Sequence, residues 1–370
     1  MTSHFIPVAS PALIGKEKEY VLDCLESTWI SSNGKYIDLF ESAFAKFCGA
    51  KYGISCCNGT AALHLALLAF DVGPGDEVIV PTLTFVATAN AVAHCGAKSV
   101  FVDSEPETWN IDVSKIEEKI TKKTKGIIVV HLYGHPADMD PVLEIAQRHK
   151  LFIIEDTAEA HGAEYKGRPV GSIGDIGTFS FYGNKIITTG EGGMIVTNSE
   201  NLARKAKLLR GQGMDSNKRY WFPILGYNYR MTNIAAAIGL AQLEKIDWQI
   251  ERRRENAKLY KKFLEKSLNV SVQPEKEWAK NVYWMTSILL GNNCSLKRDE
   301  LIARLYEAGI ETRPVFYPMH TLPIYGNYNK KEKFPVSEKL ARNGLNLPSS
   351  STLTDKDIIF ICEKINELCR

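Results

Sequence analysis

The chain has 370 residues, and 45 Lys and Arg against 43 Asp and Glu give a formal net charge of +2. A single hydrophobic core stops growing at roughly 250–300 residues, so this length predicts two domains. The near-neutral charge excludes a general electrostatic attraction to nucleic acid. No apolar stretch is long enough to cross a bilayer and the N-terminus lacks the pattern of a secretory signal, so we expect a cytoplasmic protein without membrane contact.

The first half of the sequence predicts a parallel α/β sheet. Apolar, β-branched runs alternate with segments of helical pattern, and these runs are apolar at successive positions, as in strands that helices cover on both faces. Two further runs flank a glycine-rich turn and predict a hairpin added to the sheet. The expected strands are 77–81, 99–103, 126–132 and 151–156, the expected helices 61–70 and 141–149, and the hairpin strands 178–182 and 193–197.

A change in composition places the domain boundary near Trp248. The helical segment 233–243 is rich in Ala and Gly, and it is followed by the charged amphipathic stretch ERRRENAKLYKKFLEK. We therefore expect a large domain, 1–248, and a smaller C-terminal α+β domain, 249–370. The second domain has apolar runs at 282–290 and 311–315 and ends in a helix at 354–370.

Several familiar motifs are absent or incomplete. The sequence contains no Gly-x-Gly-x-x-Gly after the first strand and no Gly-x4-Gly-Lys-[Ser/Thr], which disfavours nicotinamide and nucleoside-triphosphatase classes. Its eight cysteines form no Cys-x-x-Cys pair and are expected to be reduced and mostly buried. His131 and His135 have a metal-like spacing but lack the Glu of His-Glu-x-x-His, so no metal is predicted. His161 and His320 are expected to form hydrogen bonds.

The first candidate for chemistry is the tetrapeptide Cys57-Asn58-Gly59-Thr60 before the apolar helix 61–70. The N-terminus of a helix presents free N–H groups and the positive end of the helix dipole, so this segment can hold a phosphate. The alternative is structural: Asn-Gly makes a turn and Thr60 caps the helix.

The second candidate is Asp156, at the end of the run LFIIED. Ligands of parallel sheets bind beyond the carboxyl ends of strands, where a carboxylate can meet a positive group such as a pyridinium nitrogen. The alternative is an Asp that caps a turn at the end of a strand.

The third candidate is Lys185, within GTFSFYGNKIITTGEGGM. Most lysines are solvated surface charges, but apolar neighbours such as Phe181 and Ile186 surround this one, and the glycines allow close approach of the backbone to a bound ring. Burial destabilises the ammonium form, so Lys185 is suited to act as a Schiff-base amine.

These segments together resemble the sugar aminotransferases of the DegT/DnrJ/EryC1/StrS family, which are fold-type-I pyridoxal-phosphate enzymes. The resemblance runs nearly from end to end and follows the order of the family's motifs. It covers PVASPALIGKEKEYVLDCLESTWISSNGKYIDLFE, CCNGTAALHLAL, VIVPTLTFVATANAV, HLYGHPADMD, IEDTAEAHGAEYKGRPVGSIGDIGTFSFYGNKIITTGEGGMIVTN, GYNYRMTNIAAAIGLAQLE and ETRPVFYPMH.

The resemblance implies a role for each matching residue. Lys185 would carry pyridoxal 5'-phosphate and move the proton, Asp156 would pair with the pyridinium nitrogen, and Glu159 would lie near the phenolic oxygen. An Asn of the GYNYRM motif, here Asn228, would reach the cofactor phosphate of a partner subunit, which implies a homodimer with shared sites. The remaining implied cofactor residues are Gly59, Thr60 and Ser180 for the phosphate and Phe85, stacked on the ring.

The resemblance also implies a reaction. We expect glutamate to give its amino group to the 4-keto carbon of a GDP-linked 6-deoxy sugar, GDP-4-keto-6-deoxy-D-mannose, to form GDP-perosamine. A UDP-linked 4-keto-6-deoxy sugar is the alternative within this chemistry. A pyridoxamine-dependent sugar dehydratase has His in place of the lysine, so Lys185 disfavours it, and intact Lys185 and Asp156 disfavour a regulatory protein on the same fold.

Residues that contact the substrate are expected in segments that line the sugar-nucleotide cleft of similar enzymes. Arg313 is suited to bind a phosphate or the donor carboxylate through its planar guanidinium, and a structural ion pair with a nearby acid is an equal alternative. The position of His161 is Phe in some similar enzymes, which leaves the identity of the sugar open. The expected substrate residues are Trp29, Ser31, Arg313, Tyr317 and His320.

Overall fold

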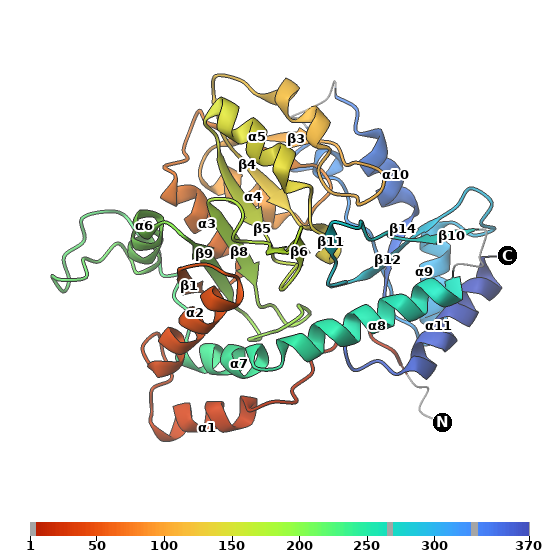
Figure 1. Cartoon of the computed structure of the whole chain (residues 1–370), viewed down its shortest axis with the longest axis horizontal. Helices are drawn as coiled ribbons and strands as arrows, with labels where there is room; N and C mark the ends of the chain where they lie inside the picture. The colour runs from red at the N-terminus through yellow and green to blue at the C-terminus, as the bar shows by residue number, and fades with distance from the viewer. Residues whose placement is uncertain (1–4, 265–268, 327–331, 370) are drawn as a thin grey trace.

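The computed structural model of the chain describes residues 5–264, 269–326 and 332–369 (Figure 1). Its α-helices are α1 (Glu17–Glu26), α2 (Lys35–Phe47), α3 (Gly59–Ala69), α4 (Ala87–His94), α5 (Met139–His149), α6 (Glu200–Arg210), α7 (Asn233–Leu243), α8 (Ile246–Leu264), α9 (Arg298–Glu307), α10 (Pro335–Asn343) and α11 (Asp355–Leu368). Its strands are β1 (Tyr52–Cys56), β2 (Glu77–Pro81), β3 (Lys98–Val102), β4 (Thr124–Val130), β5 (Phe152–Asp156), β6 (Glu164–Tyr165), β7 (Arg168–Pro169), β8 (Ile176–Ser180), β9 (Gly193–Thr197), β10 (Val270–Val272), β11 (Ala279–Lys280), β12 (Thr286–Leu290), β13 (Arg313–Pro314) and β14 (Gly344–Leu347).

The larger sheet has seven strands in the order β1-β9-β8-β5-β4-β2-β3. Neighbouring strands from β8 to β3 run parallel, whereas β9 is antiparallel to both β8 and β1. The predictions of a largely parallel sheet and of an added hairpin are therefore confirmed. The parallel strands all end at one edge of the sheet, which is where ligands bind in such folds.

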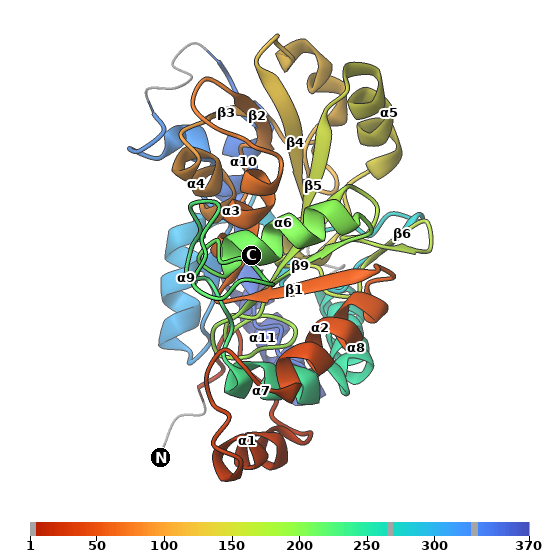
Figure 2. The same ribbon diagram turned by 90° about the vertical axis from the view of Figure 1, so that its left-hand side faces the viewer.

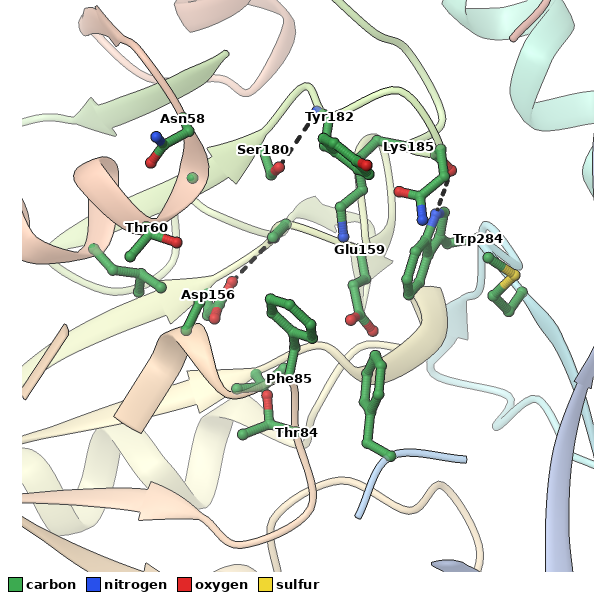
Figure 3. Close-up of a pocket in the computed structure, with 18 of the residues that line it drawn as sticks. Asn58, Thr60, Thr84, Phe85, Asp156, Glu159, Ser180, Tyr182, Lys185 and Trp284 are labelled. Atoms are coloured by element: carbon green, nitrogen blue, oxygen red, sulfur yellow. Dashed lines mark hydrogen bonds between the residues drawn. The ribbon is translucent and has the colours of Figure 1, made fainter. Parts of the chain in front are cut away.

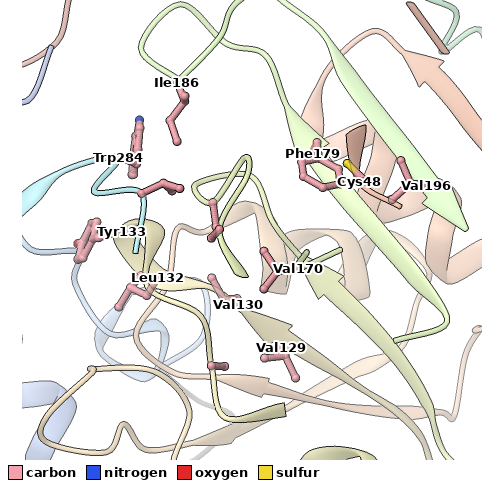
Figure 4. Close-up of a cluster of buried hydrophobic side chains, with 14 of the residues drawn as sticks. Cys48, Val129, Val130, Leu132, Tyr133, Val170, Phe179, Ile186, Val196 and Trp284 are labelled. Carbon is pink, nitrogen blue, oxygen red and sulfur yellow. The ribbon is translucent and has the colours of Figure 1, made fainter. Parts of the chain in front are cut away.

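Helices cover both faces of this sheet because its strands are apolar at successive residues. In β4, Ile127 and Val129 pack into the cluster formed with α2, α5 and α7, whereas Ile128 packs into the cluster formed with α3, α4 and α6. Figure 2 shows α6 and α2 on opposite sides of β1, and Figure 4 shows the first cluster around Val129 and Phe179. The expected strands and helices of this part all exist, with bounds shifted by one or two residues.

Strand β1 is an element that the sequence reading did not include. It lies at the edge of the large sheet and pairs with β9, with Cys56 opposite Gly193. After β1 the chain leads directly into α3. The pairing of β1 with β9 places the start of this helix beside the end of β8. The position of the predicted phosphate segment therefore depends on this strand.

The second sheet has the order β10-β12-β14-β13 and is antiparallel. Residues of α8, α9 and α11 pack against it in a separate apolar cluster, as the α+β prediction requires. Ile6 of the N-terminal segment also packs in this cluster and forms an isolated bridge with Ile310.

The division into domains 1–248 and 249–370 stays a prediction. Helix α8 begins at Ile246 and continues across the predicted boundary. The outermost residues of the two predicted domains, 1–4 and 370, lie outside the described ranges. Among the helices of those ranges, none combines the length and the apolar composition that a membrane span requires.

Candidate active site

One cavity of about 620 Å³ lies at the carboxyl edge of the large sheet. Strands β5 and β8 end at it, the segment after β2 and the N-terminus of α3 form its walls, and residues of the second sheet close it. The labelled side chains of Figure 3 converge on this cavity from several elements. The predicted residues that line it are Gly59, Thr60, Phe85, Asp156, Glu159, Ser180, Lys185 and Arg313.

The N-terminus of α3 forms a narrow cradle against the end of β8. Asn58 caps the helix, because its side-chain oxygen accepts a hydrogen bond from the Ala61 N–H at 2.8 Å. The cap is thus Asn58, and Thr60, which we considered for this role, lies inside the helix. A Cβ atom on Gly59 would come within 2.7 Å of the Ser180 Cβ, so only glycine allows this approach. The cradle presents helix N–H groups to the cavity beside the Ser180 hydroxyl.

Asp156 ends β5 and is buried beside the cavity. Its carboxylate accepts hydrogen bonds from the Thr88 hydroxyl at 2.7 Å and from the Ala158 N–H at 3.2 Å. Burial raises the pKa of Asp156, and these two hydrogen bonds oppose the rise. The Ala158 contact is therefore the turn cap that we considered as the alternative for Asp156. The same carboxylate also faces a ligand-sized cavity, where a cationic partner would stabilise its charge.

Glu159 follows Asp156 by three residues and points into the same cavity (Figure 3). Its Oε2 accepts a hydrogen bond from the Tyr133 N–H at 2.7 Å. Tyr133 adopts a positive φ of 55°, which aims this N–H at the carboxylate. Burial raises the pKa of Glu159 to about 7, and the nearby Lys185 opposes the rise.

Lys185 lies on the turn after β8, where its own N–H donates to the Tyr182 carbonyl at 2.9 Å. Burial lowers the pKa of the Lys185 ammonium, and the charges of Glu159 and Asp156 oppose the fall. Its Nζ stands 3.9 Å from the centre of the Trp284 ring. The fold therefore holds an amine with a weakened proton affinity between two carboxylates and an indole face.

Several lining residues were not predicted from the sequence. Thr88, whose hydroxyl donates to the Asp156 carboxylate, was not predicted either, although it lies within the PTLTFVAT segment, three residues after Phe85. No sequence signal indicated Trp284, because it lies far along the chain, in the apolar run expected to form a strand of the second domain. The unpredicted lining residues with polar or aromatic side chains are Thr84, Tyr182, Asn184, Glu191, Trp284, Phe316 and Asn346.

Asn228 lies outside the cavity wall within this single chain. It is exposed and forms an isolated bridge with Gly211. The segment before it, between α6 and α7, projects from the body at the left of Figure 1. Large apolar side chains of this segment are exposed, namely Met214, Tyr220, Trp221, Phe222, Ile224 and Leu225.

Of the predicted substrate residues, only Arg313 lines the cavity, and Trp29, Ser31, Tyr317 and His320 lie outside its wall. Trp29 is 57% exposed, and the Ser31 carbonyl accepts the Asn233 N–H at 2.6 Å. Tyr317 is exposed and borders a separate hollow next to Arg298. Arg313 lines the cavity but also lies 3.3 Å from the Glu311 carboxylate, so its two predicted roles both stay open.

The histidines differ in their hydrogen-bond partners. His320 Nδ1 lies 2.7 Å from the Thr82 hydroxyl, which confirms its predicted hydrogen bonding. His161 is fully buried, and neither of its ring nitrogens makes a hydrogen bond of normal geometry with the described residues, so that prediction is wrong. His131 accepts the Ala137 N–H at Nδ1, so its Nε2–H donates to the Glu155 carboxylate at 3.0 Å. Within the described ranges no group of metal-ligating side chains occurs, and all eight cysteines are free.

Comparison with known proteins gives consistent results. The profile of the DegT/DnrJ/EryC1/StrS aminotransferase family matches residues 11–366. The chain is 54% identical over 354 residues to GDP-perosamine synthase of Caulobacter vibrioides, with 95% of each chain covered. It is 54% identical over 366 residues to GDP-perosamine synthase of Escherichia coli O157:H7, with 98% of each covered.

A solved structure extends the likeness to three dimensions. The putative sugar aminotransferase Spr1654 of Streptococcus pneumoniae, in its PLP-form, superposes with a TM-score of 0.93 at 28% identity, and 99% of each chain is covered. Its apo-form superposes with a TM-score of 0.92. The fold seen here is thus shared with a protein that has been solved both with and without its cofactor.

Proposed function

This chain belongs to the DegT/DnrJ/EryC1/StrS aminotransferase family, and from that membership we propose that it converts GDP-4-keto-6-deoxy-D-mannose to GDP-perosamine with glutamate as amino donor. The nucleotide and sugar rest on the two relatives of 54% identity, both named GDP-perosamine synthase. The predictions of the family, the fold-type-I α/β class and a pyridoxal-phosphate aminotransferase are confirmed. The observation that carries the proposal is that Lys185, Asp156 and Glu159 meet in one cavity.

The cavity fits pyridoxal phosphate at both ends. The Gly59 and Ser180 cradle is open only because residue 59 lacks a Cβ, and a helix N-terminus faces it, as a phosphate requires. At the other side Asp156 is buried without a cationic partner in direct contact among the described residues, as a protonated ring nitrogen requires. When bound, the cofactor supplies the electron sink for moving an amino group between a donor and a ketone.

The chain's own residues would hold the cofactor and move the proton. Lys185 has a pKa lowered by burial, so its Nζ can exist as the free amine that binds an aldehyde and takes up a proton. Asp156 would keep the ring nitrogen protonated through its negative charge. Phe85, half exposed in the cavity, would stack on the ring, and Glu159 would face its phenolic oxygen.

We also propose that the active form is a homodimer. Asn228 and the exposed apolar segment before it lie away from the cavity of their own chain, and burying such a surface against a second copy is favourable. The partner would then supply Asn228 to the cofactor phosphate, and Trp29, Ser31, Tyr317 and His320 would lie on the sugar-nucleotide side of the site. The roles of these residues are inferred from their positions alone and stay predictions.

The experiment that tests the function is a substrate screen. The purified chain is incubated with pyridoxal phosphate, ¹⁵N-labelled glutamate, and GDP- or UDP-linked 4-keto-6-deoxy sugars, and the products are analysed by mass. We expect the ¹⁵N label in a GDP-linked amino sugar, with Lys185→Ala as the inactive control because it lacks the amine. Preferred amination of the UDP-linked sugar would select the alternative substrate, and elimination of a hydroxyl without transfer of label would indicate a dehydratase.

A further inference from the structure

Trp284 brings the second sheet into contact with the lysine of the first. It lies two residues before β12, is 5% exposed, and lines the cavity together with Met285. Its ring stacks on Tyr133 at 6.1 Å, and Tyr133 in turn packs on Phe316 at 5.1 Å. The indole is therefore held by aromatic packing, and Figure 4 shows Trp284 close to Tyr133.

Two contacts join Trp284 to the Lys185 turn. The indole N–H donates a hydrogen bond to the carbonyl of Asn184, the residue before the lysine, at 2.7 Å, drawn as a dashed line in Figure 3. The face of the same ring lies 3.9 Å from the Lys185 Nζ. One side chain thus holds both the backbone at the root of the lysine and the amine at its tip.

The charged surroundings of the Nζ explain why an aromatic face is suited to this position. The carboxyl groups of Asp156 and Glu159 lie close enough to raise the pKa of the amine, Arg313 lines the same cavity, and burial lowers the pKa of His161. A further carboxylate would bind the ammonium tightly and keep it from reacting. The π face attracts an ammonium by only about 0.5–2 kcal/mol, so the amine can leave it and return.

We propose that Trp284 is the positioning residue of Lys185. Its N–H fixes the turn that carries the lysine, and its ring face holds the Nζ at the cavity whenever the Nζ is not bonded to the cofactor. The proposal rests on the proposed function, in which Lys185 alternates between a bonded and a free amine. A lysine side chain has several rotatable bonds. When the indole holds the Nζ, the side chain loses less conformational freedom on taking up or returning a proton than an unrestrained lysine would.

The test measures the proton affinity of the amine directly. The full-length chain is freed of cofactor, a form in which the related pneumococcal protein has been solved, and is labelled briefly with acetic anhydride over a range of pH. Labelling of the Lys185 peptide is quantified by mass spectrometry and divided by its plateau at high pH, so that altered access to the reagent cancels. The variants are Trp284→Phe, which keeps a smaller ring face, and Trp284→Leu, which keeps apolar bulk without a π face.

We expect the normalised labelling at a pH below the midpoint to rise in the order parent, Trp284→Phe, Trp284→Leu, because each step removes stabilisation of the ammonium. The range of cation–π energies corresponds to an increase of roughly 2- to 30-fold for Leu over the parent. Trp278→Leu is the matched control, since Trp278 packs on Tyr165 and His135 away from the cavity, and its profile should equal that of the parent. A Leu profile equal to that of Phe, or displaced to higher pH, would overturn the proposal.

A second readout addresses the hydrogen bond to Asn184. Both substitutions remove the indole N–H, so both should lower kcat while leaving the KM for glutamate nearly unchanged. If Trp284→Leu does not fold, the comparison of Trp284→Phe with the parent decides, and identical labelling profiles there count against the proposal. Labelling requires neither glutamate nor a nucleotide sugar, so a parent enzyme that fails to aminate the GDP-linked sugar would contradict the proposed function alone.

Discussion

The Thr88 hydroxyl donates a hydrogen bond across 2.7 Å to the carboxylate of Asp156, and it joins helix α4 to the end of strand β5. Burial raises the pKa of Asp156, so a buried donor at this oxygen helps to keep the carboxylate ionised. The bond therefore links a residue with no predicted role to the charge on which the proposed chemistry depends.

We predict that Asp156→Asn and Thr88→Val both slow transamination, with the larger loss in Asp156→Asn. The amide lacks the negative charge that keeps the ring nitrogen protonated, whereas valine removes only one hydrogen bond to that charge. Such a bond contributes roughly 1.5–3 kcal/mol, so Thr88→Val should lose about 10- to 150-fold in kcat/KM. Steady-state kinetics and the visible spectrum of bound cofactor are the measurements. Near-normal rates and an unchanged spectrum in Asp156→Asn would favour a purely turn-capping role.

We predict that Asn228 completes the site of a partner subunit. Asn228→Ala should weaken retention of cofactor without touching Lys185, since the complete site would exist only in the dimer and ligand bound to the dimer stabilises it. The decisive measurement mixes Lys185→Ala subunits with Asn228→Ala subunits. If the sites are shared, one site of each mixed dimer keeps both residues and activity returns.

The control for this mixture is each variant incubated alone, where both sites of every dimer carry the same defect. Mixed dimers are verified with two different affinity tags. Absence of recovered activity in tagged, purified mixed dimers would place Asn228 in its own subunit's site or in none.

We predict that His161→Phe stabilises the fold, most strongly at acidic pH. His161 packs between Phe179 and Phe181, at 5.4 and 5.6 Å, and both ring nitrogens lack a hydrogen bond of normal geometry within the described part of the chain. An unsatisfied buried polar group costs about 1–3 kcal/mol, which a phenyl ring avoids. Burial lowers the pKa of His161 to about 3, and the nearby Ser180 backbone opposes the fall.

The pH dependence follows from that lowered pKa. Below pH 6.5 the unfolded chain gains a proton at this residue and the folded chain does not, so His161 costs stability as the pH falls toward 3. The loss amounts to about 2 kcal/mol between pH 8 and pH 5. Denaturant unfolding of both proteins at these two values measures it, and the free-energy difference between them should widen at pH 5. A difference independent of pH would show that His161 does not titrate as described.

The sequence alone determined the class of fold and the main residues that line the cavity. Apolar runs such as 151–156 predict buried parallel strands because such runs are stable only between two layers of helix, and this physical constraint is local. Asp156 ends β5, Glu159 follows it, and Lys185 follows β8, which pairs parallel with β5, so the common edge of the sheet brings them together. Their convergence in one cavity agrees with that reasoning.

Only the tertiary structure decided which distant residues complete the site. Thr88 reaches Asp156, and Trp284 reaches Lys185, through packing between elements that lie 68 and about 100 residues apart in sequence. The aromatic surroundings of His161 are likewise a property of the packed fold, since the residue type alone favours a polar partner. Composition and periodicity report how each segment buries its own surface, whereas contacts such as these depend on the relative placement of elements distant in sequence, which no single segment encodes.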